Sequence, residues 1–184
     1  VLAYYHNTVY GLKPEGKRYE ARIIDLLPTI SGNLMKYAKR AGNTKFDNYF
    51  LKHLDYILEV IESTIKRIKR EDYEKMPRVA IHCDYHPGNL KFENEKVVGM
   101  FDFDWSKIDA RCFDLALAVI YFCTTWEGKE DGDFLLDRVS IFVNSYQKEA
   151  VRGEGVGPLK DIEIHYLAEM IRAANLYVLN WDVD

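Results

Sequence analysis

The clearest pattern of apolar and polar positions lies between residues 47 and 69. Eight apolar side chains recur there at intervals of three and four, with Glu, Lys and Arg between them: Phe50, Leu51, Leu54, Ile57, Leu58, Ile61, Ile65 and Ile68. This spacing follows the 3.6-residue period of an α-helix, so it predicts one long helix with a single apolar face. We expect this helix to pack in the core and to carry no chemistry.

Shorter helices are predicted on both sides of it. Their ranges are 1–10, 18–27, 33–41, 114–125, 133–149 and 158–180. Pro28 and Gly32 are expected to separate the second helix from the third, and Pro158 is expected in the first turn of the last. Residues 114–125 are apolar on every side, which is typical of a helix at the centre of a core.

Strands are predicted only in the middle of the chain. Val79–Ile81 is a short strand candidate, and residues 90–92 and 97–101 form a hairpin joined by residues 93–96. Asp102 comes directly after the second strand of that hairpin. The sequence therefore predicts an α+β fold that is mainly helical, with one small hairpin, and a single domain over residues 1–184.

Composition excludes several classes of function. The chain has 184 residues, of which 48% are hydrophobic and 29% are charged, so a core without disulfides is expected. A net charge of -4 argues against nucleic acid as the main partner. No segment reaches the roughly 18 apolar residues that cross a bilayer, so no membrane partner is expected. The three cysteines, Cys83, Cys112 and Cys123, have no framework spacing, which predicts reduced thiols and a cytoplasmic protein.

Side chains that can act in catalysis or bind a metal gather around the predicted hairpin. The segment His82-Cys83-Asp84-Tyr85-His86-Pro87-Gly88-Asn89 precedes it, and Asp102-Phe103-Asp104 follows thirteen positions after Asn89. Phosphoryl transfer needs a carboxylate facing the attacking hydroxyl and oxygen ligands that hold Mg²⁺ against the phosphates. Pro87 and Gly88 can turn the chain so that Asp84 and Asn89 face one cavity, and a returning hairpin places Asp102 beside them.

These segments resemble the aminoglycoside phosphotransferase and choline kinase family, which shares its fold with the protein kinases. The catalytic loop of that family reads like HGDLHPGN, and residues 82–89 read HCDYHPGN. Its metal segment reads like IDWE, and residues 101–104 read FDFD; its next motif, DPxxDLA, matches residues 109–116 except for the proline. The resemblance is clear over residues 79–119. It implies the C-terminal lobe of a protein-kinase-like fold and the cofactors ATP and Mg²⁺.

The resemblance also implies a role for each matching residue. Asp84 would be the catalytic base, and Asn89 and Asp102 would bind Mg²⁺ and thereby the nucleotide. His86 would approach the transferred phosphoryl group, and Asp104 would support a second metal or a substrate. Two further residues would act as supports, His82 within the catalytic loop and Asp114 between that loop and the buried helix.

The sequence departs in four respects from the pattern of this family or of the related protein kinases. Cys83 stands where the family has glycine, and Asp104 stands where protein kinases have the glycine of Asp-Phe-Gly. Asp114 follows Asp102 by only twelve positions, which leaves no room for a long activation segment and disfavours a protein substrate. The roughly eighty residues before Asp84 are predicted to be helical and contain no Gly-rich nucleotide loop. We therefore expect the N-terminal ATP lobe to be missing and the fragment to be inactive alone.

Structural interpretations compete with the functional ones. Asp114 is also a candidate N-cap of the buried helix, and Asp109 and Arg111 are candidates for a local ion pair. Arg172 is expected at the surface, although it could meet a substrate carboxylate. For two further sets of residues, both a structural role and a ligand-binding role remain open. These are the tryptophans Trp105, Trp126 and Trp181, and the acidic residues Glu127, Glu130, Asp131 and Asp133.

Three functions remain in competition. The leading hypothesis is a kinase of a small hydroxylated metabolite such as homoserine, a sugar, choline or an aminoglycoside. The second is a kinase-like protein that binds a ligand without catalysis. The third is a metal-dependent hydrolase with His82, Asp84 and His86 as ligands, because alternate residues of a strand share one face.

Overall fold

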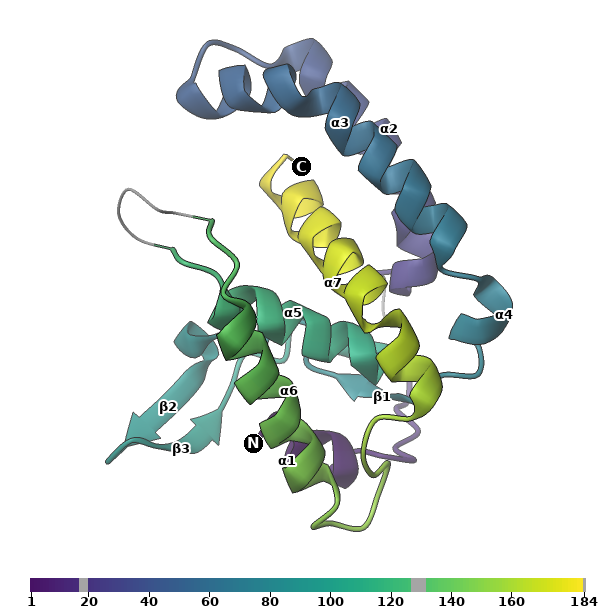
Figure 1. Ribbon diagram of the computed structural model, residues 1–184, viewed down its shortest axis with the longest axis vertical. Coiled ribbons are helices and arrows are strands. Elements are labelled where there is room, and N and C mark those ends of the chain that lie inside the picture. The colour runs from purple at the N-terminus through teal and green to yellow at the C-terminus, as the bar shows by residue number, and fades with distance from the viewer. Residues whose placement is uncertain (17–19, 127–131, 184) are drawn as a thin grey trace.

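The computed structural model describes residues 1–16, 20–126 and 132–183, and shows a mainly helical chain with two small antiparallel sheets (Figure 1). The helices are α1 (Leu2–Thr8), α2 (Ile23–Arg40), α3 (Lys45–Arg67), α4 (Arg70–Tyr73), α5 (Arg111–Cys123), α6 (Leu136–Ala150) and α7 (Asp161–Asp182). The strands are β1 (Arg78–Ile81), β2 (Leu90–Glu93), β3 (Lys96–Met100) and β4 (Lys107–Ala110). Among the described residues, none of the helices combines the length and the hydropathy needed to span a membrane.

Helix α2 corrects the prediction of two helices separated by Pro28 and Gly32. One helix runs through both residues. An interior proline costs about 3 kcal/mol, but five apolar side chains of α2 are buried, namely Ile23, Ile24, Leu27, Ile30 and Leu34. Burying side chains of this size stabilises by about 1.5–3 kcal/mol each, which outweighs the local cost.

Helix α3 confirms the long amphipathic helix. It begins after Thr44, whose hydroxyl accepts from the Asp47 backbone N–H while the Asp47 carboxylate accepts from the Thr44 N–H, forming a capping box. The predicted apolar face is buried or half-buried except at Leu51, which is 41% exposed. Helices α2 and α3 lie side by side as a long pair that also contacts α7 (Figure 1).

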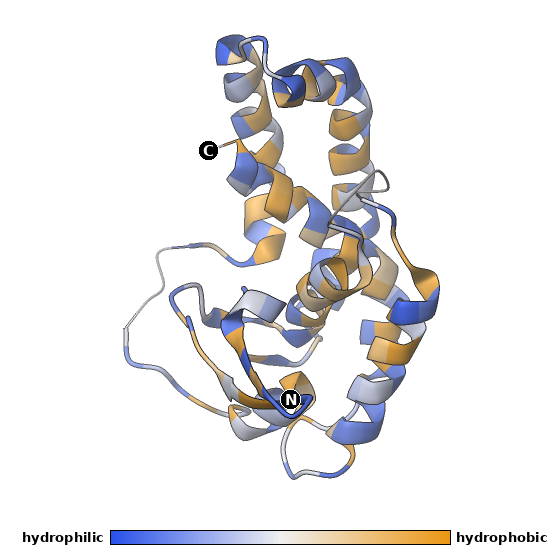
Figure 2. Cartoon of the chain, turned by 90° about the vertical axis from the view of Figure 1, so that its left-hand side faces the viewer, coloured by the Kyte–Doolittle hydropathy of each residue, from blue (hydrophilic) through white to orange (hydrophobic). Residues whose placement is uncertain are grey.

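The core centres on α5 and α7, which pack against each other. Every side chain of α5 from Arg111 to Ile120 is buried, and the outer helices carry alternating hydrophilic and hydrophobic stripes (Figure 2). Helix α5 begins three residues earlier than expected. Helix α7 begins at Asp161 rather than near Pro158, because the Glu163 carboxylate accepts from the Lys160 backbone N–H.

The strands position the catalytic loop. β2 and β3 form the predicted hairpin, but its turn has only two residues, Asn94 and Glu95, which have φ of 48° and 63°. Two successive positive φ values are typical of the tight turns that suit the twist of a hairpin. β1 pairs with β4, a strand that the sequence did not predict, with Ile81 opposite Lys107. The loop between β1 and β2 is thereby held at both ends.

Candidate functional site

The predicted catalytic loop leaves the end of β1 and closes in a 3₁₀ turn at Pro87–Asn89. The His86 ring caps this turn, because its Nδ1 accepts from the Gly88 N–H at 3.0 Å. The Asn89 N–H donates to the His86 carbonyl at 3.0 Å. Proline at the start of the turn and glycine within it let the chain reverse in three residues. The side chains of residues 84, 86 and 89 are therefore brought together.

Asp84 and Asn89 are in direct contact. The Asn89 amide Nδ2 donates to both the carbonyl and the carboxylate Oδ2 of Asp84, each at 2.9 Å. The His86 Nε2 lies 3.5 Å from the same carboxylate oxygen. Asp84 Oδ1 has no hydrogen bond to any residue that the structure describes. One oxygen of Asp84 is thus fixed by the loop and the other is available to a hydroxyl group.

The hairpin returns the chain to Asn89, as predicted. The Phe101 N–H donates to the Asn89 carbonyl at 3.2 Å, which places Asp102 one residue beyond that contact. Asp102 is exposed and has a φ of 64°, a left-handed conformation that Asp tolerates better than most residues. Within the described residues, its carboxylate has no hydrogen bond or ion pair. Asp104 is also exposed, and no contact joins it to Asp84, Asn89 or Asp102.

The oxygen donors at the loop fit a magnesium ion that keeps ligands from elsewhere. Both partners of the Asn89 Nδ2 are acceptors, so the amide nitrogen faces Asp84 and the amide oxygen faces away. That oxygen and the Asp102 carboxylate are hard ligands of the kind that Mg²⁺ prefers, together with water and phosphate. No cluster of three His, Cys, Asp or Glu side chains suitable for a metal occurs among residues 1–16, 20–126 and 132–183.

His82 lies beneath the loop and uses both ring nitrogens for backbone contacts. It is fully buried, its Nε2 lies 3.1 Å from the Phe101 carbonyl and its Nδ1 accepts from the Asp84 N–H at 3.3 Å. The ring thus connects the catalytic loop to the end of the hairpin. It also has no free nitrogen for a metal, which removes one ligand of the set that the hydrolase hypothesis requires.

Asp114 anchors α5 to the loop and does not cap the helix. The N-cap of α5 is Ala110, which corrects the prediction of Asp114 as N-cap. The Asp114 carboxylate accepts from the backbone N–H groups of His82 and Cys83, at 2.9 and 2.7 Å. It also contacts the His6 Nε2 at 2.9 Å.

His6 was not identified as a site residue from the sequence. It is fully buried in α1, and its other ring nitrogen contacts the Tyr146 hydroxyl at 2.7 Å. The sequence around His6 shows only an apolar helical repeat. It could not indicate this contact, because the two partners of His6 lie 108 and 140 residues away in the chain.

A cavity of about 250 Å³ opens beside Asp84. Its walls are Cys83, Asp84, Trp105, Tyr121, Tyr177, Val178, Trp181 and Asp182. The rings of Trp105 and Trp181 are perpendicular with centroids 3.8 Å apart. Burial raises the pKa of the Tyr121 hydroxyl to about 12, so it is neutral at physiological pH. The cavity is therefore aromatic and carries acidic groups, and none of its described walls is Lys or Arg.

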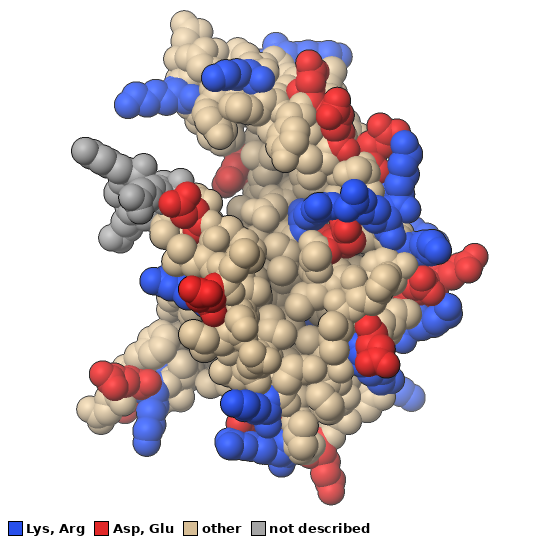
Figure 3. Space-filling model, viewed as in Figure 1, with Lys and Arg blue, Asp and Glu red and all other residues tan. Residues whose placement is uncertain are grey.

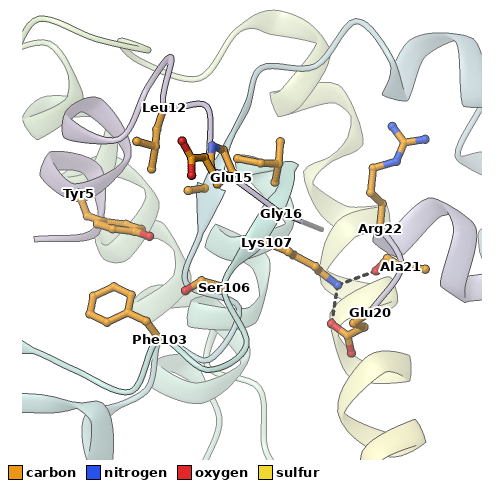
Figure 4. A pocket seen from close by; sticks show the side chains of 13 residues that line it. Tyr5, Leu12, Glu15, Gly16, Glu20, Ala21, Arg22, Phe103, Ser106 and Lys107 are labelled. Carbon is orange, nitrogen blue, oxygen red and sulfur yellow. Dashed lines mark hydrogen bonds and ion pairs between the residues drawn. The ribbon is translucent and has the colours of Figure 1, made fainter. Parts of the chain in front are cut away.

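A buried polar chain supports one wall of this cavity. The Cys83 thiol donates to the Tyr177 hydroxyl at 3.5 Å, and that hydroxyl donates to the Glu20 carboxylate at 3.0 Å. Glu20 pairs with the Lys107 Nζ at 2.7 Å, and Lys107 also donates to the Ala21 carbonyl (Figure 4). Burial raises the pKa of the Cys83 thiol to about 12, which keeps it protonated as a donor.

Cys83 adopts the backbone conformation that the family's glycine suits. Its φ is 66°, in the left-handed region where a Cβ is unfavourable by about 1–2 kcal/mol. In this unfavourable backbone conformation, the buried Cys83 thiol contacts the Tyr177 hydroxyl.

Another cavity, of about 770 Å³, is larger than the one beside Asp84 and is lined in part by Phe103. Tyr5, Phe103 and Ser106 line one side of it and Glu20, Arg22 and Lys107 the other (Figure 4). Residues 17–19 lie outside the described chain. Asp84 and Asn89 are not among its walls, so cavity size does not identify the site of chemistry.

Other sequence predictions are corrected or stay open. Asp109 and Arg111 form no local pair: Asp109 accepts from the Ile23 N–H and the Tyr73 hydroxyl, and Arg111 pairs with Glu163 at 2.7 Å. The tertiary partners are buried and better placed than a neighbour two residues away. Three members of the acidic segment, Glu127, Glu130 and Asp131, lie outside the described residues.

Comparison with known proteins places this geometry in a family. Residues 20–141 match the model of the "Phosphotransferase enzyme family". Homoserine kinase of Parvibaculum lavamentivorans is 25% identical over 123 residues, which is 67% of this chain and 35% of that protein. The chain thus spans about a third of the length of this curated relative.

Solved structures show the same fold. The chain resembles the ethanolamine kinase of Plasmodium vivax with a TM-score of 0.62 and 15% identity, over 99% of this chain and 52% of that one. It also resembles the choline kinase of Cryptosporidium parvum with a TM-score of 0.55 and 14% identity, over 99% of this chain and 56% of that one. The kinase-like fold expected from the sequence is thereby confirmed.

Proposed function

Because the chain belongs to the phosphotransferase enzyme family, we propose that it takes part in moving the γ-phosphate of ATP to an alcohol group of a small, amine-bearing molecule. The observation that carries this proposal is the carboxylate of Asp84. One of its oxygens is held by Asn89, and the other is free of described partners beside an aromatic cavity. A carboxylate in this state can orient a hydroxyl group and accept its proton.

The residues of the loop divide the work. Asp84 receives the proton of the acceptor hydroxyl as the oxygen attacks phosphorus. Asn89 fixes the orientation of Asp84 through two hydrogen bonds, which keeps the attacking group in line. His86 lies 3.5 Å from Asp84 on the open side of the loop and meets the transferred phosphoryl group.

Asn89 and Asp102 would hold a magnesium ion at this site. When bound, such an ion neutralises the charge of the phosphate groups. The contact from Phe101 to the Asn89 carbonyl keeps Asp102 next to the loop for this role. We assign no role to Asp104, which lies three residues beyond the backbone contact between Phe101 and Asn89.

The walls of the cavity favour a cationic acceptor. Aromatic faces attract ammonium groups, and four rings surround the space, those of Trp105, Tyr121, Tyr177 and Trp181. Asp182 adds a carboxylate with no ion pair to any described residue. An alcohol with an ammonium group and no anionic group therefore fits best.

Homoserine is the second candidate, favoured by the relative of Parvibaculum lavamentivorans. Its carboxylate would need a cationic or amide partner, and the described walls contain no Lys or Arg. Arg172, which the sequence offered for this purpose, instead pairs with Glu169 at 3.1 Å and lines another groove. Assay of the natural full-length protein with ethanolamine, choline, homoserine and glucose distinguishes the candidates.

Replacement of the proposed base tests the reaction itself. We expect Asp84→Asn to lower the rate of phosphate transfer by about 10²- to 10⁴-fold, because the amide cannot take a proton. Asp137→Asn, at the start of α6, is the matched control and should leave the rate unchanged. Both variants should retain the circular dichroism spectrum and melting temperature of the parent protein. Turnover retained by Asp84→Asn would overturn Asp84 as the base. Absence of Mg-ATP binding by the parent protein would favour a non-catalytic ligand-binding protein.

A further inference from the structure

A second cavity adjoins the one at Asp84. Its volume is about 480 Å³, and it lies between the C-terminal end of α5 and the same stretch of α7. Its walls are Ile120, Thr124, Trp126, Gly132, Phe134, Ile171, Asn175, Val178, Leu179 and Asp182. Val178 and Asp182 line both cavities, so the two spaces meet along one edge of α7.

The order of residues along α7 gives the path between the cavities. Trp181 and Tyr177 face Asp84, Val178 and Asp182 stand at the junction, and Ile171 lies at the far end. Eleven residues of helix separate Ile171 from Asp182, which corresponds to about 16 Å. Figure 3 shows an indentation of the molecular surface where this end of α7 emerges.

The two cavities differ in chemical character. The second is lined mainly by aliphatic and aromatic groups, and its described walls include no Lys or Arg. Two of its polar side chains are already engaged: the Asn175 amide donates to the Ile171 carbonyl at 3.3 Å, and the Trp126 Nε1 donates to the Tyr121 carbonyl at 2.9 Å. Only Asp182, at the junction, offers a charge.

From this arrangement we propose that the acceptor is amphiphilic: an amino alcohol whose hydroxyl lies at Asp84, whose ammonium group lies at Asp182, and whose apolar substituent occupies the second cavity. The inference rests on the proposed kinase function and extends it. Pockets of this size bury most of the surface of a small ligand. Asp182 at the junction favours a positively charged group, and the second cavity favours a longer apolar substituent.

A series of N-alkyl ethanolamines tests the proposal by isothermal titration calorimetry on the 184-residue chain. The series runs from ethanolamine through the N-butyl to the N-hexyl compound. We expect the dissociation constant to fall with chain length, by up to about fourfold for each methylene that is fully buried. Hexanol, which has the chain without the ammonium group, should bind much more weakly than N-hexylethanolamine.

Two variants assign the gain to the second cavity. Phe134 is 38% exposed, and Phe134→Ala should raise the dissociation constant of the N-hexyl compound at least about fivefold. The same variant should leave ethanolamine binding within about twofold. Leu136→Ala is the matched control, since Leu136 is 71% exposed and lines neither cavity, and it should change neither ligand. Asp182→Asn should weaken every ammonium ligand by the same factor.

The outcomes separate the two proposals. Ethanolamine binding with no gain from chain length would overturn the apolar compartment and leave the kinase proposal standing. An equal loss of both ligands in Phe134→Ala would also overturn it, because the residue would then act on the fold. Failure of every amine to bind, with phosphate transfer to a neutral alcohol intact, would overturn the ammonium position as well.

Discussion

Asp84 and Asp114 are two carboxylates at the same catalytic loop in opposite surroundings. Asp114 is fully buried and receives contacts from two backbone N–H groups and the His6 ring. The Asp84 side chain is 25% exposed, and only one of its oxygens has described partners. Burial of a carboxylate is tolerated only when hydrogen bonds replace water, so Asp114 is committed to structure.

The difference shows how residues of one type divide between support and chemistry. A fully satisfied carboxylate fixes the path of the loop. A half-satisfied carboxylate at a cavity retains an oxygen for an external group. His82 and His86 differ in exposure in the same way, because His82 is fully buried with both ring nitrogens on backbone groups, whereas the His86 side chain is 32% exposed beside Asp84.

Replacing each of the two carboxylates by an amide should give the largest difference between them. We expect Asp114→Asn to lower the free energy of unfolding by about 3–5 kcal/mol, because the Asn amide nitrogen would face a buried backbone N–H donor and the carboxylate acceptor of the His6 contact would be lost. Asp84→Asn should change the free energy of unfolding by less than about 0.5 kcal/mol. Urea unfolding followed by circular dichroism measures both values, and similar losses in the two variants would contradict the division.

Lys107 extends the comparison from buried anions to a buried cation. Its side chain is 2% exposed and pairs with Glu20, which is 16% exposed. Lys107→Met would leave Glu20 without its cationic partner and with only the Tyr177 hydroxyl as donor, and we expect a loss of about 2 kcal/mol, less than for a fully buried pair.

Lys91→Met is the control for Lys107→Met. The Lys91 side chain is 65% exposed and pairs with Glu93, so its loss should cost no more than about 0.5 kcal/mol. The double variant Lys107→Met with Glu20→Gln should recover part of the stability, and additive losses in a double-mutant cycle would refute the coupling.

Asp47 sharpens the comparison with a carboxylate that is hydrogen-bonded at the start of helix α3. The Tyr37 hydroxyl, followed by the Thr44 hydroxyl and N–H, lowers the pKa of Asp47 below its ordinary value of 3.8. A lowered pKa contributes stability above the ordinary value and loses it as pH falls through the folded-state value. The melting temperature of Asp47→Asn should therefore be below that of the parent protein at pH 7, and the gap should narrow at pH 3.

Asp55→Asn, an exposed position on the same helix, is the control for Asp47→Asn. It should match the parent protein at both pH values. A gap for Asp47→Asn that persists unchanged at pH 3 would show that the carboxylate charge is not the cause.

A long apolar repeat predicted helix boundaries better than single proline and glycine residues did. The apolar repeat from Phe50 to Ile68 located α3 to within two residues at each end. Pro28 and Gly32 were interpreted as breaks, yet the buried side chains of α2 continue through them. Strand β4 escaped prediction because four residues with mixed polarity have no period of their own and depend on pairing with β1.

Of the site, the sequence by itself determined the loop that we propose to be catalytic, because His82, Asp84, His86 and Asn89 lie within eight residues whose proline and glycine dictate the turn. It also determined that Asp102 returns to that loop, because a short hairpin permits little else. Only the tertiary structure decided the partners of those groups: His6 and Asp114, Glu20 and Lys107, and the walls that α5 and α7 give the acceptor cavity. These contacts join residues far apart in the chain. They form because buried elements pack against each other, and no local sequence pattern shows which elements will pack together.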